Sequence, residues 1–127
     1  MQKCFTIAGG RDFDDFFSAD EFIKKIFKES GVVKKRDIVI ISGGAKGADK
    51  IAEDFSKKYE LKNIIMNANW DLNGKAAGHI RNKEMASKSL EFGERTLIAF
   101  WDGKSRGTKN MIENANKMKI DVKIFYY

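Results

Sequence analysis

The stretch "IVIISGGAKGADKIAEDF", residues 38–55, has the pattern of a buried strand that leads through a glycine-rich turn into a helix. An apolar run rich in β-branched residues ends at Ser42, glycines follow at positions 43, 44 and 47, and an amphipathic helix pattern begins directly after them. Glycines between a strand and a helix let backbone amides approach a ligand closely, so this turn predicts an anion site. The plainer alternative is that the glycines only permit a tight turn and close packing of the helix on the sheet.

Strand and helix patterns alternate along the whole chain. Strands are expected at 4–8, 37–42, 63–68, 96–101 and 121–127, and helices at 18–30, 46–60, 77–90 and 108–119. Strands that are apolar along their full length and alternate with helices predict a parallel sheet covered on both faces. Right-handed crossovers then favour the strand order 3-2-1-4-5. The predicted fold class is therefore α/β, a Rossmann-like three-layer sandwich around a five-stranded, mostly parallel sheet.

Particular residues are expected to set the ends and faces of the helices. Ser18 and Glu21 fit a capping box at the start of the first helix, and Thr108 fits the N-cap of the last. In the third helix the apolar residues are expected on one inward face, although the pattern is less clean there. These residues are Ile80, Met85 and Leu90.

The composition is that of an ordinary folded domain, with 127 residues, 43% hydrophobic and 33% charged. We expect one domain over residues 1–127, with its one cysteine, Cys4, buried in the first apolar run. No apolar stretch approaches the roughly 20 residues that span a bilayer, and no signal-peptide region is evident, so we expect a cytoplasmic protein without membrane association. The net charge of +6 fits a phosphate-bearing ligand, although a solvated surface accounts for most of the lysines.

A sheet of order 3-2-1-4-5 places a ligand crevice beyond the carboxyl ends of strands 1 and 4. The loops after strands 1, 2 and 4 each combine glycines, a cation and a helix start, whose free amides attract anions. We expect a phosphate against the amides of Gly43, Gly44 and Gly47, with the loop after strand 1 opposite. The candidate ligand-binding residues in these loops are Gly9, Gly10, Arg11, Ser42, Gly43, Gly44, Lys46, Gly47, Asp49, Trp101, Asp102, Ser105, Gly107 and Thr108.

The segment "NANWDLNGKAAGHIRNKEMA", residues 67–86, adds three candidate ligand-binding residues. Trp70 is suited to stack on a base, Arg81 to clamp a phosphate, and Asn82 to bind a base edge or a ribose. The alternative for Trp70 is a packed tryptophan among surface polar groups.

Several kinds of site are not expected. Neither G-x-x-x-x-G-K-[ST] nor G-x-G-x-x-G occurs. One cysteine and one histidine make no metal cluster, and no cofactor is predicted. His79 is expected to be a packing or helix-start residue, and Ser42 has no predicted His/Asp partners for acyl transfer.

Four segments together resemble a known family. "IAGGRDF", "SGGAKGADKIAEDF", "NWDLNGKAAGHIRNKEMA" and "AFWDGKSRGTKNMIENA", in this order, are similar to the YspA-like branch of the SLOG superfamily, over roughly residues 4–127. The resemblance implies a Rossmann-like fold that binds a nucleotide or nucleotide-derived ligand, signalling nucleotides included. Relatives are commonly dimers or larger, which leaves a homo-oligomer open.

An alternative function comes from the LOG phosphoribohydrolases of the same superfamily. Their motif P-G-G-x-G-T-x-x-E resembles residues 102–108, but its glutamate falls at Met111 here. A nucleotide N-glycosidase needs a carboxylate near the sugar. Asp102 is the candidate catalytic residue if chemistry occurs, because Glu84 is expected to pair with Arg81 or Lys88. We therefore expect binding without cleavage.

A second alternative is single-stranded DNA binding, as in the DprA proteins. Their S-G-x-A-x-G-x-D motif resembles residues 42–49. A DNA track needs several exposed stacking residues, and only Trp70, Trp101 and Phe13 are candidates. A small nucleotide-derived molecule, not nucleic acid, is therefore the expected partner.

Overall fold

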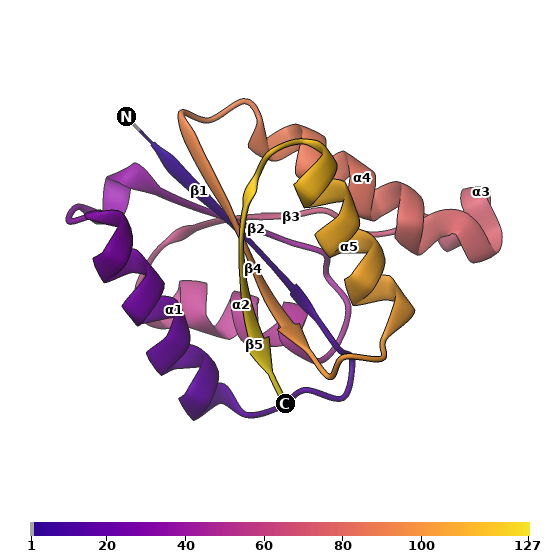
Figure 1. The fold of residues 1–127 in the computed structure, drawn as a ribbon, viewed down its shortest axis with the longest axis horizontal. Coiled ribbons are helices and arrows are strands. Elements are labelled where there is room, and N and C mark those ends of the chain that lie inside the picture. The colour runs from indigo at the N-terminus through magenta and orange to yellow at the C-terminus, as the bar shows by residue number, and fades with distance from the viewer. Residues whose placement is uncertain (1) are drawn as a thin grey trace.

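The computed structural model describes residues 2–127. Five strands form one parallel sheet in the order β3-β2-β1-β4-β5, which confirms the predicted fold class (Figure 1). β1 is central, with Thr6 paired to Ile41 of β2 on one side and to Leu97 of β4 on the other. The strands span Lys3–Gly9 (β1), Ile38–Ser42 (β2), Lys62–Ile65 (β3), Glu94–Trp101 (β4) and Asp121–Tyr126 (β5).

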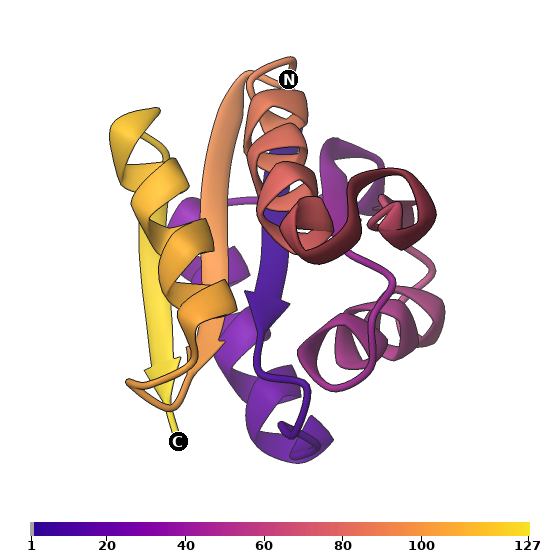
Figure 2. The same cartoon turned by 90° about the vertical axis from the view of Figure 1, so that its right-hand side faces the viewer.

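Helices cover both faces of the sheet and complete the three layers (Figures 1 and 2). The helices are α1 (Phe16–Ser30), α2 (Ala48–Lys58), α3 (Trp70–Asn73), α4 (Ala77–Ser89) and α5 (Arg106–Lys117), and short 3-10 turns lie at Lys35–Asp37 and Gly74–Ala76. α1 and α2 pack on one face, while α4 and α5 pack side by side on the other. Within residues 2–127, no helix combines the length and apolar character needed to cross a membrane.

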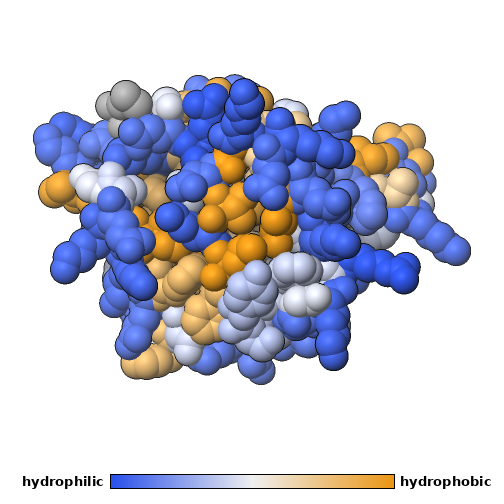
Figure 3. Space-filling model, viewed as in Figure 1, coloured by the Kyte–Doolittle hydropathy of each residue, from blue (hydrophilic) through white to orange (hydrophobic). Residues whose placement is uncertain are grey.

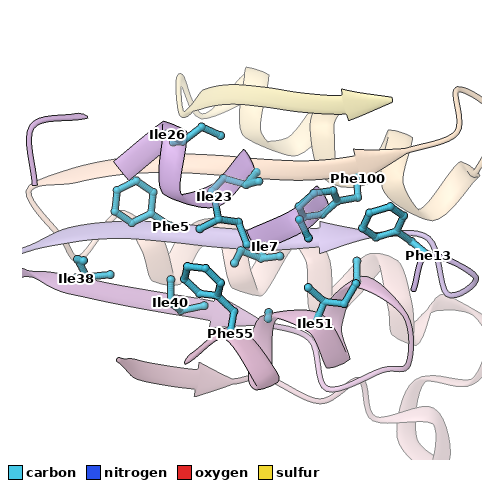
Figure 4. Packing of buried hydrophobic residues seen from close by; sticks show 14 residues of the cluster. Phe5, Ile7, Phe13, Ile23, Ile26, Ile38, Ile40, Ile51, Phe55 and Phe100 are labelled. Atoms are coloured by element: carbon cyan, nitrogen blue, oxygen red, sulfur yellow. The ribbon is translucent and has the colours of Figure 1, made fainter. Parts of the chain in front are cut away.

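Alternate residues of β1, β2 and β4 supply two separate cores. Phe5 and Ile7 of β1 pack with Ile23 of α1 and Phe55 of α2, as Figure 4 shows. Cys4 of the same strand points the other way, into a core that includes Met85, Leu97 and Met111. Cys4 is buried, as expected, and burial raises the pKa of its thiol to about 12.

One edge of the sheet is partly apolar. β5 is the outer strand beyond β4, and its Val122, Ile124 and Phe125 are half-buried. Figure 3 shows apolar atoms gathered near the centre of the face on which β5 runs, between flanking polar side chains. α1 contributes there as well, because Phe22 packs against Phe125 with ring centroids 5.3 Å apart.

Two predicted helix caps were wrong. α1 begins at Phe16, and its N-cap is Asp15, whose carboxylate accepts hydrogen bonds from the Ser18 amide at 3.1 Å and the Ser18 hydroxyl at 2.6 Å. α5 begins at Arg106 with Ser105 as its N-cap. In each case a good cap three residues upstream takes the role, and the residue predicted as the cap lies in the first turn.

The predicted inward face of α4 was correct only for Met85. Ile80 and Leu90 are 39% and 40% exposed, whereas Ala77, Ala86, Ser89 and Asn82 face the core. Small inward residues let α4 lie close to the sheet, and the larger apolar side chains are left outside. β3 is also shorter than predicted, ending at Ile65 where 68 was expected.

Candidate functional site

A cleft of about 460 Å³ opens at the carboxyl edge of the sheet, where the loops after β1 and β4 diverge. This is the place where the strand order predicts a crevice. The predicted candidates that line it are Gly9, Gly10, Arg11, Asp49, Trp70, Arg81, Asn82, Ser105, Gly107 and Thr108. The remaining candidates lie outside its lining: Ser42, Gly43, Gly44, Lys46, Gly47, Trp101 and Asp102.

The first turn of α5 forms one wall of the cleft. Gly107 is the second helical residue, and a Cβ placed on it would have no heavy atom within 4 Å. The backbone of this turn is therefore open to a ligand, and first-turn amides carry partial positive charge. The indole N–H of Trp101 donates to the Ser105 carbonyl at 3.1 Å, which fixes the loop that leads into the helix.

Asn82 ties α4 to this wall. It is 6% exposed, and its Nδ2 donates to the Gly107 carbonyl and to Asn110 Oδ1, both at 3.1 Å. Arg81, the preceding residue, points toward the loop after β2, where its Nη1 donates a hydrogen bond to the Gly43 carbonyl at 2.5 Å. The Arg-Asn pair therefore braces the loop after β2 and the start of α5 against α4, on either side of the cleft.

The glycines of the loop after β2 are packed against protein. At Gly43 a Cβ would lie 2.7 Å from Arg81 Cζ, and at Gly44 it would collide with Asn67. At Gly47, where φ is +75°, it would lie 2.6 Å from the Arg11 Cα. The Ala48 amide donates to the Gly10 carbonyl at 3.1 Å, so the loops after β1 and β2 are in direct backbone contact. These glycines serve close packing in this structure, and the anion site at their amides stays a prediction.

Asp49 is the buried charge of the site. Its carboxylate accepts a hydrogen bond from the Ala45 amide at 3.2 Å, which holds the loop after β2. Burial raises the pKa of Asp49, and the nearby Arg81 guanidinium opposes that rise. Ser42 is also buried, and its hydroxyl is hydrogen-bonded to Asn63 Oδ1 at 3.1 Å, so it serves the sheet and not the cleft.

An aromatic ring and a cation form the outer wall. Trp70 is 50% exposed, and the Arg11 guanidinium lies over its ring at 5.6 Å from the centroid. The Trp70 ring lies beside Gly78 of α4, where an added Cβ would be in ordinary contact with the indole at 3.7 Å. Lys75 and His79 line the same part of the cleft.

Sequence reasoning missed Lys75, Gly78, His79 and Asp12. Gly78 and His79 precede Asn82 by four and three residues on α4, which is the spacing of one helix face, so the periodicity could have shown them, whereas Lys75 lies in the 3-10 turn before the helix. Asp12 could not be found in this way, because it is held by the Tyr127 hydroxyl at 2.7 Å, 115 residues away in sequence. Burial and this hydrogen bond raise the pKa of Tyr127. Residues 2–127 contain no group of three or more potential metal-ligating side chains.

Two other expectations about side chains were wrong. Phe13 is 3% exposed and stacks on Phe100 with centroids 4.8 Å apart, so it offers no surface to a base. Lys88 forms its ion pair with Glu91 at 2.9 Å, and Arg81 binds the Gly43 carbonyl, so neither pairs with Glu84.

The Asp102 carboxylate is engaged by its own loop. It accepts hydrogen bonds from the Lys104 and Ser105 amides, both at 2.8 Å. These amides hold the pKa of Asp102 below its usual range. Its role is therefore to fix the turn before α5, outside the cleft lining.

The fold and cleft define a class: parallel α/β proteins with a cleft at the topological switch point. Residues 6–72 match the model of the YspA, cpYpsA-related SLOG family. Gene 61 protein of Mycobacterium phage D29 is 33% identical over 90 residues, which are 67% of this chain and 69% of that protein. The chain belongs to the YspA, cpYpsA-related SLOG family.

A solved structure shares the fold. DNA processing protein A (DprA) of Streptococcus pneumoniae superimposes on 97% of this chain with a TM-score of 0.51 and 15% sequence identity. The chain spans 58% of that protein's length. At this identity the similarity establishes the architecture alone.

Proposed function

We propose that the protein binds a nucleotide or nucleotide-derived small molecule, signalling nucleotides included, in the cleft at the carboxyl edge of the sheet. The observation that carries the proposal is that two chemically different walls line the same cleft. The open first turn of α5 at Gly107 suits a phosphate, and the half-exposed ring of Trp70 suits a base.

The charges of the lining also favour an anionic ligand. Arg11, Lys75 and Arg81 contribute positive charge, and the two carboxylates of the lining are partly neutralised or enclosed. Asp12 accepts the Tyr127 hydroxyl, and Asp49 is buried beside Arg81. A phosphate entering the cleft would therefore meet more accessible cations than anions.

A thermal-shift screen tests this proposal. The probes are AMP, NAD, ADP-ribose and cyclic dinucleotides, and a ligand present at about a hundred times its Kd stabilises the fold by about 2.7 kcal/mol. Gly107→Asp should abolish the shift, because its carboxylate would occupy the helix start and repel a phosphate. Asn116→Asp, an exposed change of equal charge on the same helix, should leave the shift intact. A panel without any shift would contradict the proposal.

We further propose that the ligand is bound and not cleaved. Met111 is 1% exposed and lines the cleft, so it supplies no charge there. Asp102 is committed to its own turn. Incubation with AMP, NAD and ADP-ribose should release no free base or ribose 5-phosphate above background. If turnover occurs and is lost in Asp12→Asn or Asp49→Asn, the N-glycosidase alternative replaces this one.

A further inference from the structure

The loop after β1 carries two opposite charges at the rim of the cleft. Arg11 and Asp12 are neighbours in sequence, both are exposed, and both line the cleft. A guanidinium attracts an anionic ligand and a carboxylate repels it, so the entry of an anion depends on which of the two groups is free to meet it. The contacts that hold this loop therefore control the charge of the rim.

Tyr127 contacts this loop from the end of β5. Its backbone amide donates to the Trp101 carbonyl at 3.1 Å, which extends the pairing of β5 with β4 by one residue. Its ring packs against Phe13, with ring centroids 4.7 Å apart, and its hydroxyl donates to Asp12 Oδ1 at 2.7 Å. Figure 1 shows the end of β5 and the loop after β1 at the same edge of the sheet, and Figure 4 shows Phe13 beside Phe100 there. The sheet thus fixes the position of Tyr127, and Tyr127 in turn fixes Asp12.

Gly10 leaves the room that this hydrogen bond needs. A Cβ on Gly10 would collide with the Tyr127 hydroxyl and would lie 2.7 Å from Asp12 Oδ1. Gly10 is not among the glycines with a positive φ, so space and not backbone conformation requires a glycine here. Its carbonyl accepts the amides of Phe13 at 3.3 Å and Ala48 at 3.1 Å, which fixes the turn from residue 10 to residue 13. Gly10 and Tyr127 therefore fit together as two parts of one contact.

We propose that Tyr127 is a positioning residue of the cleft: its hydroxyl binds the Asp12 carboxylate, so that Arg11 is the free charge of this rim and an anion can enter. Arg11 lies over the Trp70 ring, 5.6 Å from its centroid, where it faces a ligand that stacks on the indole. Without the hydroxyl, the carboxylate is free to turn toward Arg11, where it repels a phosphate and competes with it for the guanidinium. This role rests on the proposed function, because it needs an anionic ligand in the cleft.

Two variants test the role of the hydroxyl. Tyr127→Phe keeps the ring against Phe13 and removes only the hydroxyl. Calorimetric titrations with AMP, NAD, ADP-ribose and a cyclic dinucleotide should show that the probe bound most tightly by the wild type loses about tenfold in affinity. The double variant Tyr127→Phe/Asp12→Asn has no carboxylate to release, so its affinity should return close to that of the wild type. A purely structural loss would not be recovered by removing a charge.

Hydrogen exchange in the ligand-free protein reports on the loop alone. The Phe13 amide closes the turn onto the Gly10 carbonyl, so it should exchange several-fold faster in Tyr127→Phe and stay fast in the double variant. Tyr126→Phe is the matched control, because it removes the same atom from the next residue. The Tyr126 ring points to the opposite side of β5, beside Trp101 at 5.9 Å between centroids, so both exchange and affinity should be unchanged. A melting curve for each variant establishes that the fold is retained.

The outcomes separate this role from the proposed function. A wild type that binds none of the four probes overturns the proposed function, and the role of Tyr127 toward a ligand with it. Wild-type binding with an equal affinity in Tyr127→Phe, or a double variant that binds no tighter than Tyr127→Phe, overturns the role of Tyr127 and leaves the proposed function standing. A Phe13 amide that exchanges equally fast in the wild type and Tyr127→Phe also overturns it, since the hydroxyl would then hold nothing.

Discussion

Gly47 lies where the loops after β1 and β2 touch. Its φ of +75° and ψ of −127° suit glycine alone, and an added Cβ would press on the Arg11 backbone. Gly74 has a similar backbone, with φ +56° and ψ −134°, but open space around it. Gly47→Ala should therefore destabilise the fold by about 3 kcal/mol or more, and Gly74→Ala by about 1–2 kcal/mol. Urea unfolding measures both, and equal losses would contradict the packing role.

Asp49 makes stability depend on pH. Its folded pKa is raised by burial, so between the unfolded pKa, about 3.9, and the folded value the native state binds more protons than the unfolded state. The contribution of this group to stability therefore falls as pH rises through that window. Asp49→Asn does not titrate, so the wild type should lose stability relative to this variant between acid and neutral pH. A relative gain in urea unfolding over the same range would mean that Arg81 and the loop amides outweigh burial.

At the scale of elements, strand order was predictable and one helix face was not. Five apolar runs separated by helices allow few parallel topologies, and the observed order is the commonest of them. The outward position of Ile80 was not predictable, because α4 packs through small residues, and the usual periodicity follows large apolar ones.

The location of the cleft was predictable, while the part played by each loop was not. A switch point between β1 and β4 follows from strand order alone. Whether a glycine faces a ligand or protein depends on contacts distant in sequence. Arg81, 38 residues further along the chain, donates to the Gly43 carbonyl. The two residues are too far apart in the sequence for a local pattern to predict this contact.

Asn82 connects two elements, so its loss should affect the site as well as the fold. Asn82→Ala leaves the Gly107 carbonyl and Asn110 without their shared donor, and should cost about 1–3 kcal/mol. The same substitution should also lower the affinity for any ligand that binds at the start of α5. Asn114→Ala, which loses only a hydrogen bond within α5, is the control. Equal effects of the two variants on ligand affinity would show that the hydrogen bonds of Asn82 do not position α5.

For the whole molecule, the cleft offers a nucleic-acid strand its charges and one exposed ring. Trp70 is the exposed ring of the cleft, and Phe13 is buried. A single strand of about 20 nucleotides should therefore bind only through phosphates, with a dissociation constant of roughly 10⁻⁴–10⁻⁶ M that weakens steeply with added salt. Fluorescence anisotropy across a salt series measures this. Sub-micromolar binding at physiological salt would favour the DNA-binding alternative.

We propose that one cleft holds both a phosphate and a base. This proposal is tested most directly by following backbone amide and indole N–H signals in an NMR titration with AMP, NAD, ADP-ribose and a cyclic dinucleotide. At least one probe should produce its largest shifts at Gly107, Thr108 and Arg11, together with the Trp70 indole. Largest shifts in the packed loop 43–47 or on the outer face of α4, or no saturable shift with any of the four probes, would contradict it.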